Sequence, residues 1–253
     1  MIKMINVCAG YAGEEVLHDI NLEFEAGKVT VIVGPNGCGK STLLKTIVKL
    51  NEYSNGTIMI GGENMNQYDS VSLARRVAYL PQNKRTPDIT VLRMVLHGRF
   101  AYLKYPRRYR KEDYEIAMKA LRWVGIEDLK DKNVSELSGG TQQKVYIAMA
   151  LAQDTDTILL DEPTTYLDIA HQMKMMKLAR VLADSGKSVV MVLHDLAHGF
   201  QVADQMIILR EGKVEICGSP EEVYKSGIVE NVFEVGFKHI QIDGEKKYFV
   251  YQR

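Results

Sequence analysis

The sequence contains little of what marks a secreted or nucleic-acid-binding chain. Its three cysteines, Cys8, Cys38 and Cys217, are odd in number and widely spaced, so they form neither a disulfide framework nor a zinc pattern. A reducing compartment is the simplest interpretation. Lys+Arg and Asp+Glu both number 32, so no overall basic field favours nucleic acid. We therefore expect no nucleic-acid partner.

Long hydrophobic runs are also missing. The longest, at 29–33 and 189–193, fall far short of the roughly 20 residues that a membrane-spanning helix needs. The amino terminus lacks the apolar segment of a signal peptide. If the chain serves a membrane, we expect its hydrophobic partner to be another chain.

Short apolar runs alternate with helical stretches. The run at 29–33 is β-branched, as expected for a strand buried on both faces. Similar runs at 157–162 and 188–195 flank a helix that starts near Ile169 and ends before Gly186. This βαβ alternation predicts an α/β fold with a parallel sheet. We also expect strands at 55–62 and 75–82, hairpins at 206–216 and 239–251, and amphipathic helices at 116–126 and 142–153.

The segment GPNGCGKST follows the first buried strand and precedes a helical stretch, which is the context that a phosphate-binding loop requires. Its glycines allow backbone N–H groups to surround phosphates at a helix amino terminus. Lys40 is expected to reach the β- and γ-phosphates of ATP, Ser41 to ligate Mg²⁺, and Thr42 to touch the α-phosphate. The alternative, a glycine-rich turn with a surface lysine, leaves this context unexplained. The expected nucleotide contacts are Gly34, Pro35, Asn36, Gly37, Cys38, Gly39, Lys40, Ser41 and Thr42.

Two acidic residues end the apolar run at 157–162. Carboxylates at the carboxyl end of a buried strand lie at the edge where α/β sheets bind ligands. Asp161 is expected to hold Mg²⁺, through water. Glu162 is the candidate general base for a water in line with the γ-phosphate. By themselves the two residues would fit simple strand capping equally well; the phosphate loop favours catalysis.

The segment LSGGTQQK at 137–144 resembles the signature motif of ATP-binding cassette (ABC) ATPases. In that family Ser138 and Gly140, with Gly139 between them, correspond to residues that bind the γ-phosphate of ATP held by a second subunit. A helix that begins here would direct free N–H groups outward. A serine helix cap with a flexible turn is the alternative. Thr141 departs from the residue usual in importers.

The resemblance extends over essentially the whole chain. Gln82 is similar to the residue that senses Mg²⁺ and couples to the permease, and Asp168 to one that communicates across the dimer. His194 resembles the switch histidine that contacts the γ-phosphate, and Tyr11 the aromatic that stacks on adenine, although Tyr11 also fits a plain surface role. The resemblance implies Lys40, Gln82, Glu162 and His194 as catalytic residues and Ser41, Gln82 and Asp161 as metal ligands.

The family resemblance also implies a P-loop NTPase fold, with a RecA-like parallel core, an amino-terminal antiparallel β subdomain and a helical insertion. We expect one domain over 1–253. Its parts are the core with the β subdomain at 1–86 and 156–217, the helical signature subdomain at 87–155, and a carboxy-terminal extension at 218–253.

Segments at 96–102, 164–172, 191–196 and 218–224 resemble importer ATPases for iron–siderophore, haem and cobalamin complexes. The branch implies a homodimer on the cytoplasmic face of the cell membrane, bound to integral permease subunits and served by a substrate-binding lipoprotein. We expect import of an iron chelate, with haem, cobalamin or another metal chelate as alternatives. A soluble ABC ATPase of translation or DNA repair is disfavoured because one cassette is present and Ser41–Ser138 leaves no room for a coiled coil.

Three smaller features carry separate expectations. The pair His194 and His198 is similar to a zinc motif, but His194 follows a strand, so we assign His198 a structural role. The basic, tyrosine-bearing segment at 99–111 is interpreted as a solvated loop rather than a nucleic-acid surface. Cys38 lies near a helix amino terminus, which should favour its thiolate and make it reactive.

Overall fold

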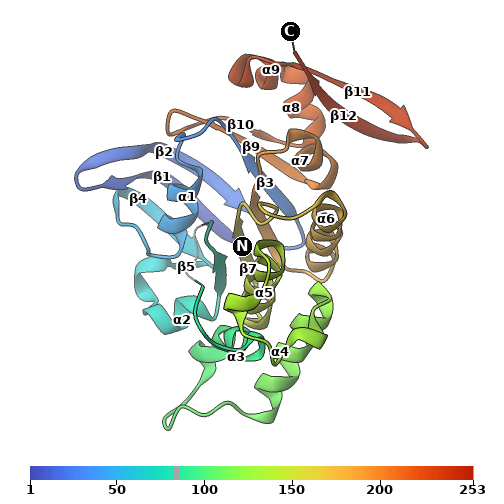
Figure 1. The fold of residues 1–253 in the computed structure, drawn as a ribbon. Coiled ribbons are helices and arrows are strands. Elements are labelled where there is room, and N and C mark those ends of the chain that lie inside the picture. Colours follow the sequence, from blue (N-terminus) through green and yellow to red (C-terminus); the bar gives the residue numbers. More distant parts are fainter. Residues whose placement is uncertain (83–85, 253) are drawn as a thin grey trace.

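Two sheets organise the structure (Figure 1). The computed structural model describes residues 1–82 and 86–252. The first sheet is antiparallel, with strand order β2-β1-β4-β5. Its strands are β1 (Ile2–Tyr11), β2 (Glu14–Phe24), β4 (Tyr53–Ile60) and β5 (Glu63–Asn64).

The second sheet has the order β10-β9-β3-β8-β7-β6 and is parallel except for β10, which forms a hairpin with β9. Its strands are β3 (Val29–Val33), β6 (Val77–Leu80), β7 (Thr157–Asp161), β8 (Ser188–Val192), β9 (Gln205–Arg210) and β10 (Lys213–Gly218). The expected parallel sheet and the hairpin through Glu211 and Gly212 are therefore confirmed.

Core packing explains why polar and apolar residues do not alternate along the central strands. Val29, Val31 and Val33 of β3 pack into one hydrophobic cluster, whereas Ile32 packs into a second cluster beneath the antiparallel sheet. A strand buried on both faces favours apolar residues at every position. The parallel arrangement brings the carboxyl ends of β3, β7 and β8 to one edge, and the candidate site residues follow those ends.

The helices cover both faces of this sheet and form a separate group around α3, α4 and α5 (Figure 1). Their bounds are α1 (Lys40–Ile47), α2 (Ser70–Ala74), α3 (Val91–Leu96), α4 (Lys111–Val124), α5 (Gly139–Ala152), α6 (Ile169–Asp184), α7 (Leu196–Val202), α8 (Pro220–Ser226) and α9 (Ile228–Phe233). Short 3₁₀ segments are η1 (Met65–Gln67), η2 (His97–Tyr102), η3 (Glu127–Leu129) and η4 (Val134–Glu136). In the described part of the chain, no helix meets the length and apolarity that crossing a membrane demands.

Helix α4 begins earlier than its apolar pattern, which starts at Ile116. The Asp113 carboxylate accepts the Arg110 backbone N–H at 2.9 Å and so caps a polar first turn. The helix ends at Gly125, whose φ of 68° stops it. Helix α6 agrees with its expected bounds because Asp168 caps its start.

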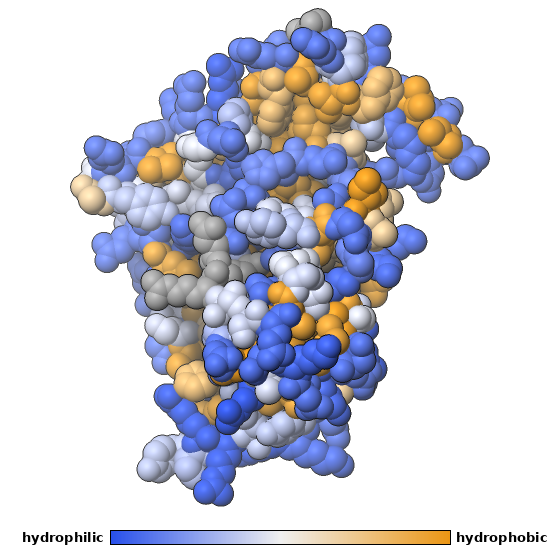
Figure 2. Space-filling view, viewed as in Figure 1, coloured by the Kyte–Doolittle hydropathy of each residue, from blue (hydrophilic) through white to orange (hydrophobic). Residues whose placement is uncertain are grey.

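The carboxy terminus forms a second hairpin, as expected, from β11 (Gly236–Ile242) and β12 (Glu245–Tyr251). Phe237 and Tyr248 pack on Phe200 of α7, with ring centroids 4.7 and 4.9 Å apart. The outer face leaves Ile240 and Phe249 partly exposed. Figure 2 shows apolar side chains gathered near this end of a surface that is otherwise mainly hydrophilic.

Candidate nucleotide-binding and hydrolysis site

The loop between β3 and α1 has the close packing that a phosphate cradle requires. Gly39 has a φ of 104°, which L side chains rarely adopt. A Cβ on Gly34 would lie 2.2 Å from the carbonyl oxygen of Leu209. Lys40 is buried, and its ammonium donates to the carbonyls of Gly34 and Pro35 at 2.8 and 2.9 Å. The cationic group therefore lies inside the loop, where phosphate oxygens can replace the carbonyls.

Asp161 ends β7 with one oxygen satisfied and one free. Its Oδ2 accepts the Tyr79 hydroxyl at 3.2 Å, whereas Oδ1 is buried and has no hydrogen-bond partner among the residues that the structure describes. Burial raises the Asp161 pKa, and the neighbouring Ser41 and Tyr79 hydroxyls oppose that rise. A buried carboxylate oxygen without a partner is costly, and together with the Ser41 hydroxyl it forms a hard-oxygen set that fits Mg²⁺.

Glu162 is held from three sides. His194 Nε2 lies 2.6 Å from its Oε1, while Gln82 Nε2 and Thr165 Oγ1 donate to Oε2 at 2.7 and 3.2 Å. The backbone of Glu162 has a φ of 51°, and its N–H bonds the carbonyl of Val192 at 3.2 Å. Non-glycine residues in this conformation often lie at functional sites. The strand end thus aims this carboxylate at the edge of the sheet.

The structure places Gln82 and His194 in direct contact with Glu162, while the catalytic roles of the three residues stay predictions. Gln82 contacts Glu162, and its expected role as a metal ligand stays a prediction. Tyr79 was not predicted as a site residue, and Thr165 was predicted only as part of the segment that leads to Asp168. Thr165 lies three residues after Glu162, so its contact is local, whereas only the pairing of β6 with β7 brings Tyr79 beside Asp161.

The candidate signature residues begin α5. Ser138 is the N-cap: its Oγ accepts the Thr141 N–H at 3.4 Å and lies 2.9 Å from Thr141 Oγ1. A Cβ on Gly140 would lie 2.9 Å from the Tyr166 carbonyl oxygen, so glycine permits close approach of the segment that follows Glu162. Ser138 and Gly139 are exposed. Thr141 therefore reinforces the helix start.

Two other predicted residues occupy exposed positions. Asp168 caps α6 by accepting the His171 N–H at 2.9 Å, and its pKa is lowered by that backbone bond and by the His171 ring. Tyr11 ends β1 and is 45% exposed, which leaves its ring available for stacking. His198 lies 3.2 Å from Asp195, the N-cap of α7, in keeping with a structural role.

Comparison with known proteins shows which family combines such a loop, strand ends and helix. The family description "ABC transporter" matches residues 17–165. The chain belongs to the ABC transporter family. It is an ABC ATPase, with the P-loop NTPase fold that the family shares.

Individual relatives of this ABC ATPase agree over most of its length. It is 42% identical over 226 residues to a ferric enterobactin transport ATP-binding protein of Escherichia coli (strain K12), covering 88% of this chain and 83% of the relative. It resembles a putative metal-chelate type ABC transporter in an inward-facing conformation, with a TM-score of 0.85 at 25% identity, covering 100% of this chain and 98% of the other. A dimeric ATP-binding cassette bound to ADP and Pi matches with a TM-score of 0.77 at 30% identity, covering 87% and 99%.

The expectation of a reactive Cys38 in this ABC ATPase is wrong. Cys38 is buried, and burial raises the pKa of its thiol more than the nearby Lys40 lowers it. Its Sγ lies 3.9 Å from the Lys40 ammonium. The cysteine packs in the second hydrophobic cluster, beside Gly34.

The interpretation of 99–111 as a solvated loop is wrong for its first residue. Arg99 is buried and pairs with buried Asp113 at 3.1 Å, with its guanidinium 3.9 Å from the centroid of the Tyr102 ring. Tyr105, in contrast, is 97% exposed. Arg99 therefore ties η2 to α4, and the continuous exposed part of the segment is residues 104–108.

Proposed function

We propose that two copies of this ABC ATPase close around two MgATP molecules at the cytoplasmic face of the cell membrane and drive import of an iron–siderophore or related iron chelate through a permease. The observation that carries the ATPase part is the three-sided contact of Gln82, Thr165 and His194 with Glu162. Haem, cobalamin and other metal chelates are the alternative cargoes.

In this proposal Glu162 accepts the proton of the attacking water. Its carboxylate can do so because it lies at a strand end beside the phosphate loop and accepts hydrogen bonds that orient it. Both of its oxygens are engaged by Gln82 and His194, so water must displace one of these contacts before reaction. Breaking or keeping the contacts of Glu162 with Gln82 and His194 would therefore link the segments that carry these two residues to hydrolysis.

Phosphate charge is neutralised by Lys40 and by Mg²⁺, which stabilises the developing negative charge when bound. Ser41 and the free Oδ1 of Asp161 would hold the metal. Tyr79 orients Asp161 through the other oxygen and is therefore a positioning residue. His194 contacts Glu162 and would move to the γ-phosphate when nucleotide binds.

The pairing of two copies is supported by the exposure of the signature residues. Ser138 and Gly139 lie at a helix start whose N–H groups favour an anion, yet the hydrogen bonds of Ser138 are local. A second copy would present this helix start to the nucleotide held by the first. A related cassette is dimeric with ADP and Pi. One chain would then supply half of each of two sites.

The cargo assignment is supported by relatives and not by any residue of this chain. One relative is named for ferric enterobactin transport, and a structural neighbour is described as a metal-chelate type. An ATPase of the family contacts permease rather than cargo, so the membrane and lipoprotein partners belong to the same proposal. Fold-level likeness alone would not supply this assignment.

Uptake measurements test the proposal. Cells that lack this chain should fail to accumulate radiolabelled iron from ferric siderophores, and the wild-type chain should restore uptake whereas Glu162→Gln should not. Labelled haem and cobalamin form parallel arms. Restoration of haem or cobalamin uptake, with siderophore uptake unaffected by the deletion, would replace the iron-chelate cargo while keeping the importer.

A further inference from the structure

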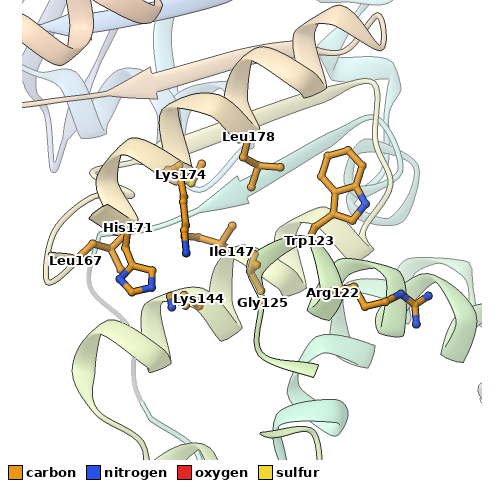
Figure 3. Close-up of a pocket in the computed structure, with 11 residues that line it drawn as sticks. Arg122, Trp123, Gly125, Lys144, Ile147, Leu167, His171, Lys174 and Leu178 are labelled. Carbon is orange, nitrogen blue, oxygen red and sulfur yellow. The ribbon is translucent and has the colours of Figure 1, made fainter. Parts of the chain in front are cut away.

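A cavity of about 310 Å³ lies between α4, α5 and α6, and Figure 3 shows the side chains that line it. Trp123 belongs to α4, Lys144 and Ile147 to α5, and Lys174 and Leu178 to α6. The phosphate loop, Asp161 and Glu162 do not contribute to the lining. The cavity therefore lies where the helical group packs on a helix of the parallel-sheet core, apart from the hydrolysis site.

Two lysines approach each other at one end of this cavity. In Figure 3 Lys174 extends from α6 toward Lys144 on α5. Among residues 1–82 and 86–252, neither ammonium has a carboxylate within ion-pair distance. Burial and the charge of Lys174 lower the Lys144 pKa, while Asp168 opposes the shift. Lys174 is exposed and Lys144 is half-buried, so water partly screens their repulsion, and an anion between them would relieve the remainder.

The other charges near the cavity are already matched. His171 lies 2.8 Å from the Asp168 carboxylate, so that acid is engaged by a ring at the cavity wall. Arg122 pairs with Glu127 at 3.1 Å, and its guanidinium points away in Figure 3. No carboxylate lines the cavity within the described chain. Lys144 and Lys174 thus carry its unbalanced positive charge.

The rest of the lining is apolar. Ile147 and Met175 are buried, Leu178 is partly buried, and Trp123 keeps 39% of its surface exposed at the end opposite the lysines. The volume is at the lower limit of typical small-molecule sites. A hydrophobic wall next to two ammonium groups is complementary to a molecule with an apolar body and an anionic head.

We propose that this cavity binds a small amphipathic anion, a carboxylate carried on an aromatic or short acyl body. The carboxylate would lie between Lys144 and Lys174, and the body would pack on Ile147, Leu178 and Trp123. Helix α5 begins at the signature serine and α6 begins next to Asp168, so the ligand would bridge the helical group and the core. If the ligand binds one arrangement of the helical group and the core more tightly than another, it changes the affinity for nucleotide, and nucleotide changes the affinity for the ligand by the same factor.

Trp123 is the only tryptophan in the sequence, so intrinsic fluorescence reports on the cavity directly. Phenylacetate is the probe, phenylacetamide is its neutral match, and inorganic phosphate is an anion without an apolar body. Phenylacetate should change Trp123 emission saturably and bind about tenfold more tightly than either comparison ligand. Equal affinity for phenylacetamide, or for phosphate, would overturn the proposed ligand class.

Variants locate the site. Lys144→Gln and Lys174→Gln should each weaken phenylacetate about tenfold because a charge-assisted hydrogen bond is lost. Lys119→Gln is the matched control, since Lys119 lines a neighbouring cavity of about 190 Å³ that Trp123 also borders. That variant should bind like the wild type. Thermal unfolding shows whether each variant is folded.

Unchanged affinity in both folded lysine variants would refute the site, as would equal weakening by Lys119→Gln. Binding by Trp123 emission is independent of ATP turnover and of iron uptake. A failed iron-chelate assignment therefore leaves this result intact, and the converse also holds. If the ligand couples to nucleotide, phenylacetate should also shift the MgATP affinity, and Lys144→Gln should remove that shift.

Discussion

The site has a hydrolysis side, around Glu162, and a signature side, around Ser138. The two sides differ in how many contacts a single chain makes around them. Glu162 is buried and contacted by three side chains from three segments. Ser138 is exposed, and within the described chain its side chain bonds only to its own helix start. The first side is organised in the isolated chain, whereas the second offers its groups outward. The difference is what the proposed pairing of two copies requires, since the exposed signature residues would complete the site of a partner.

The largest effect should come from the organised side. Glu162→Gln should lower the rate of ATP hydrolysis roughly 10²–10⁴-fold, because an amide cannot accept the proton. MgATP binding and pairing should persist, measured by size-exclusion chromatography with nucleotide. Glu136→Gln, at an exposed position, is the control. Wild-type turnover by Glu162→Gln would remove this residue as the base.

The exposed side should respond through association. Ser138→Arg should reduce hydrolysis roughly 10²-fold in the purified chain by obstructing a donor that acts on the partner's nucleotide. Binding of MgATP to the single chain should change little, measured by a fluorescent ATP analogue. Ser135→Arg, three residues away and also exposed, is the control. Loss of nucleotide binding by the single chain would show that Ser138 acts within its own subunit.

A smaller effect should appear in stability. Burial raises the Asp161 pKa, so ionising this group costs stability; the cost is absent at low pH and grows as pH rises from the unfolded toward the folded pKa. Asp161→Asn should therefore stabilise the nucleotide-free protein by about 1 kcal/mol at neutral pH while Mg²⁺-dependent hydrolysis falls. Thermal unfolding across pH measures this, with exposed Asp156→Asn as control. A gain that persists unchanged at acid pH would exclude the ionisation cost as its source.

The smallest effect concerns Cys38. Burial raises the pKa of both thiols, but the Cys38 side chain is buried whereas Cys217 is exposed, so Cys38 should react with a thiol reagent more slowly than Cys217. Cys38→Ser should keep hydrolysis within about twofold, because small buried polar substitutions without catalytic contact have modest effects. Mass spectrometry of partly labelled protein gives the order of reaction. Faster labelling of Cys38 than of Cys217 would restore the reactive-thiolate interpretation.

Local patterns were sufficient for much of this protein. The β-branched run at 29–33 and its glycine-rich sequel predicted a buried strand, a phosphate loop and a helix, because each depends on neighbours in the chain. The start of α6 near Ile169 and the alternative of a helix cap at Ser138 came from local sequence for the same reason. The predicted start of a helix was less accurate where capping, rather than the spacing of apolar residues, decides it. Helix α4, for example, begins at Lys111, before its apolar pattern.

Contacts between distant segments were decided only by the tertiary structure. Tyr79 reaches Asp161 because β6 pairs with β7, and burial by packing reversed the expected pKa shift of Cys38. Arg99 is buried by Asp113 and Tyr102 although its segment looks solvated in sequence. The sequence by itself determined the family and the residue types of the site. Packing decided which charges are matched, which oxygen is left free and where an unassigned cavity opens, since desolvation and proximity depend on all segments together.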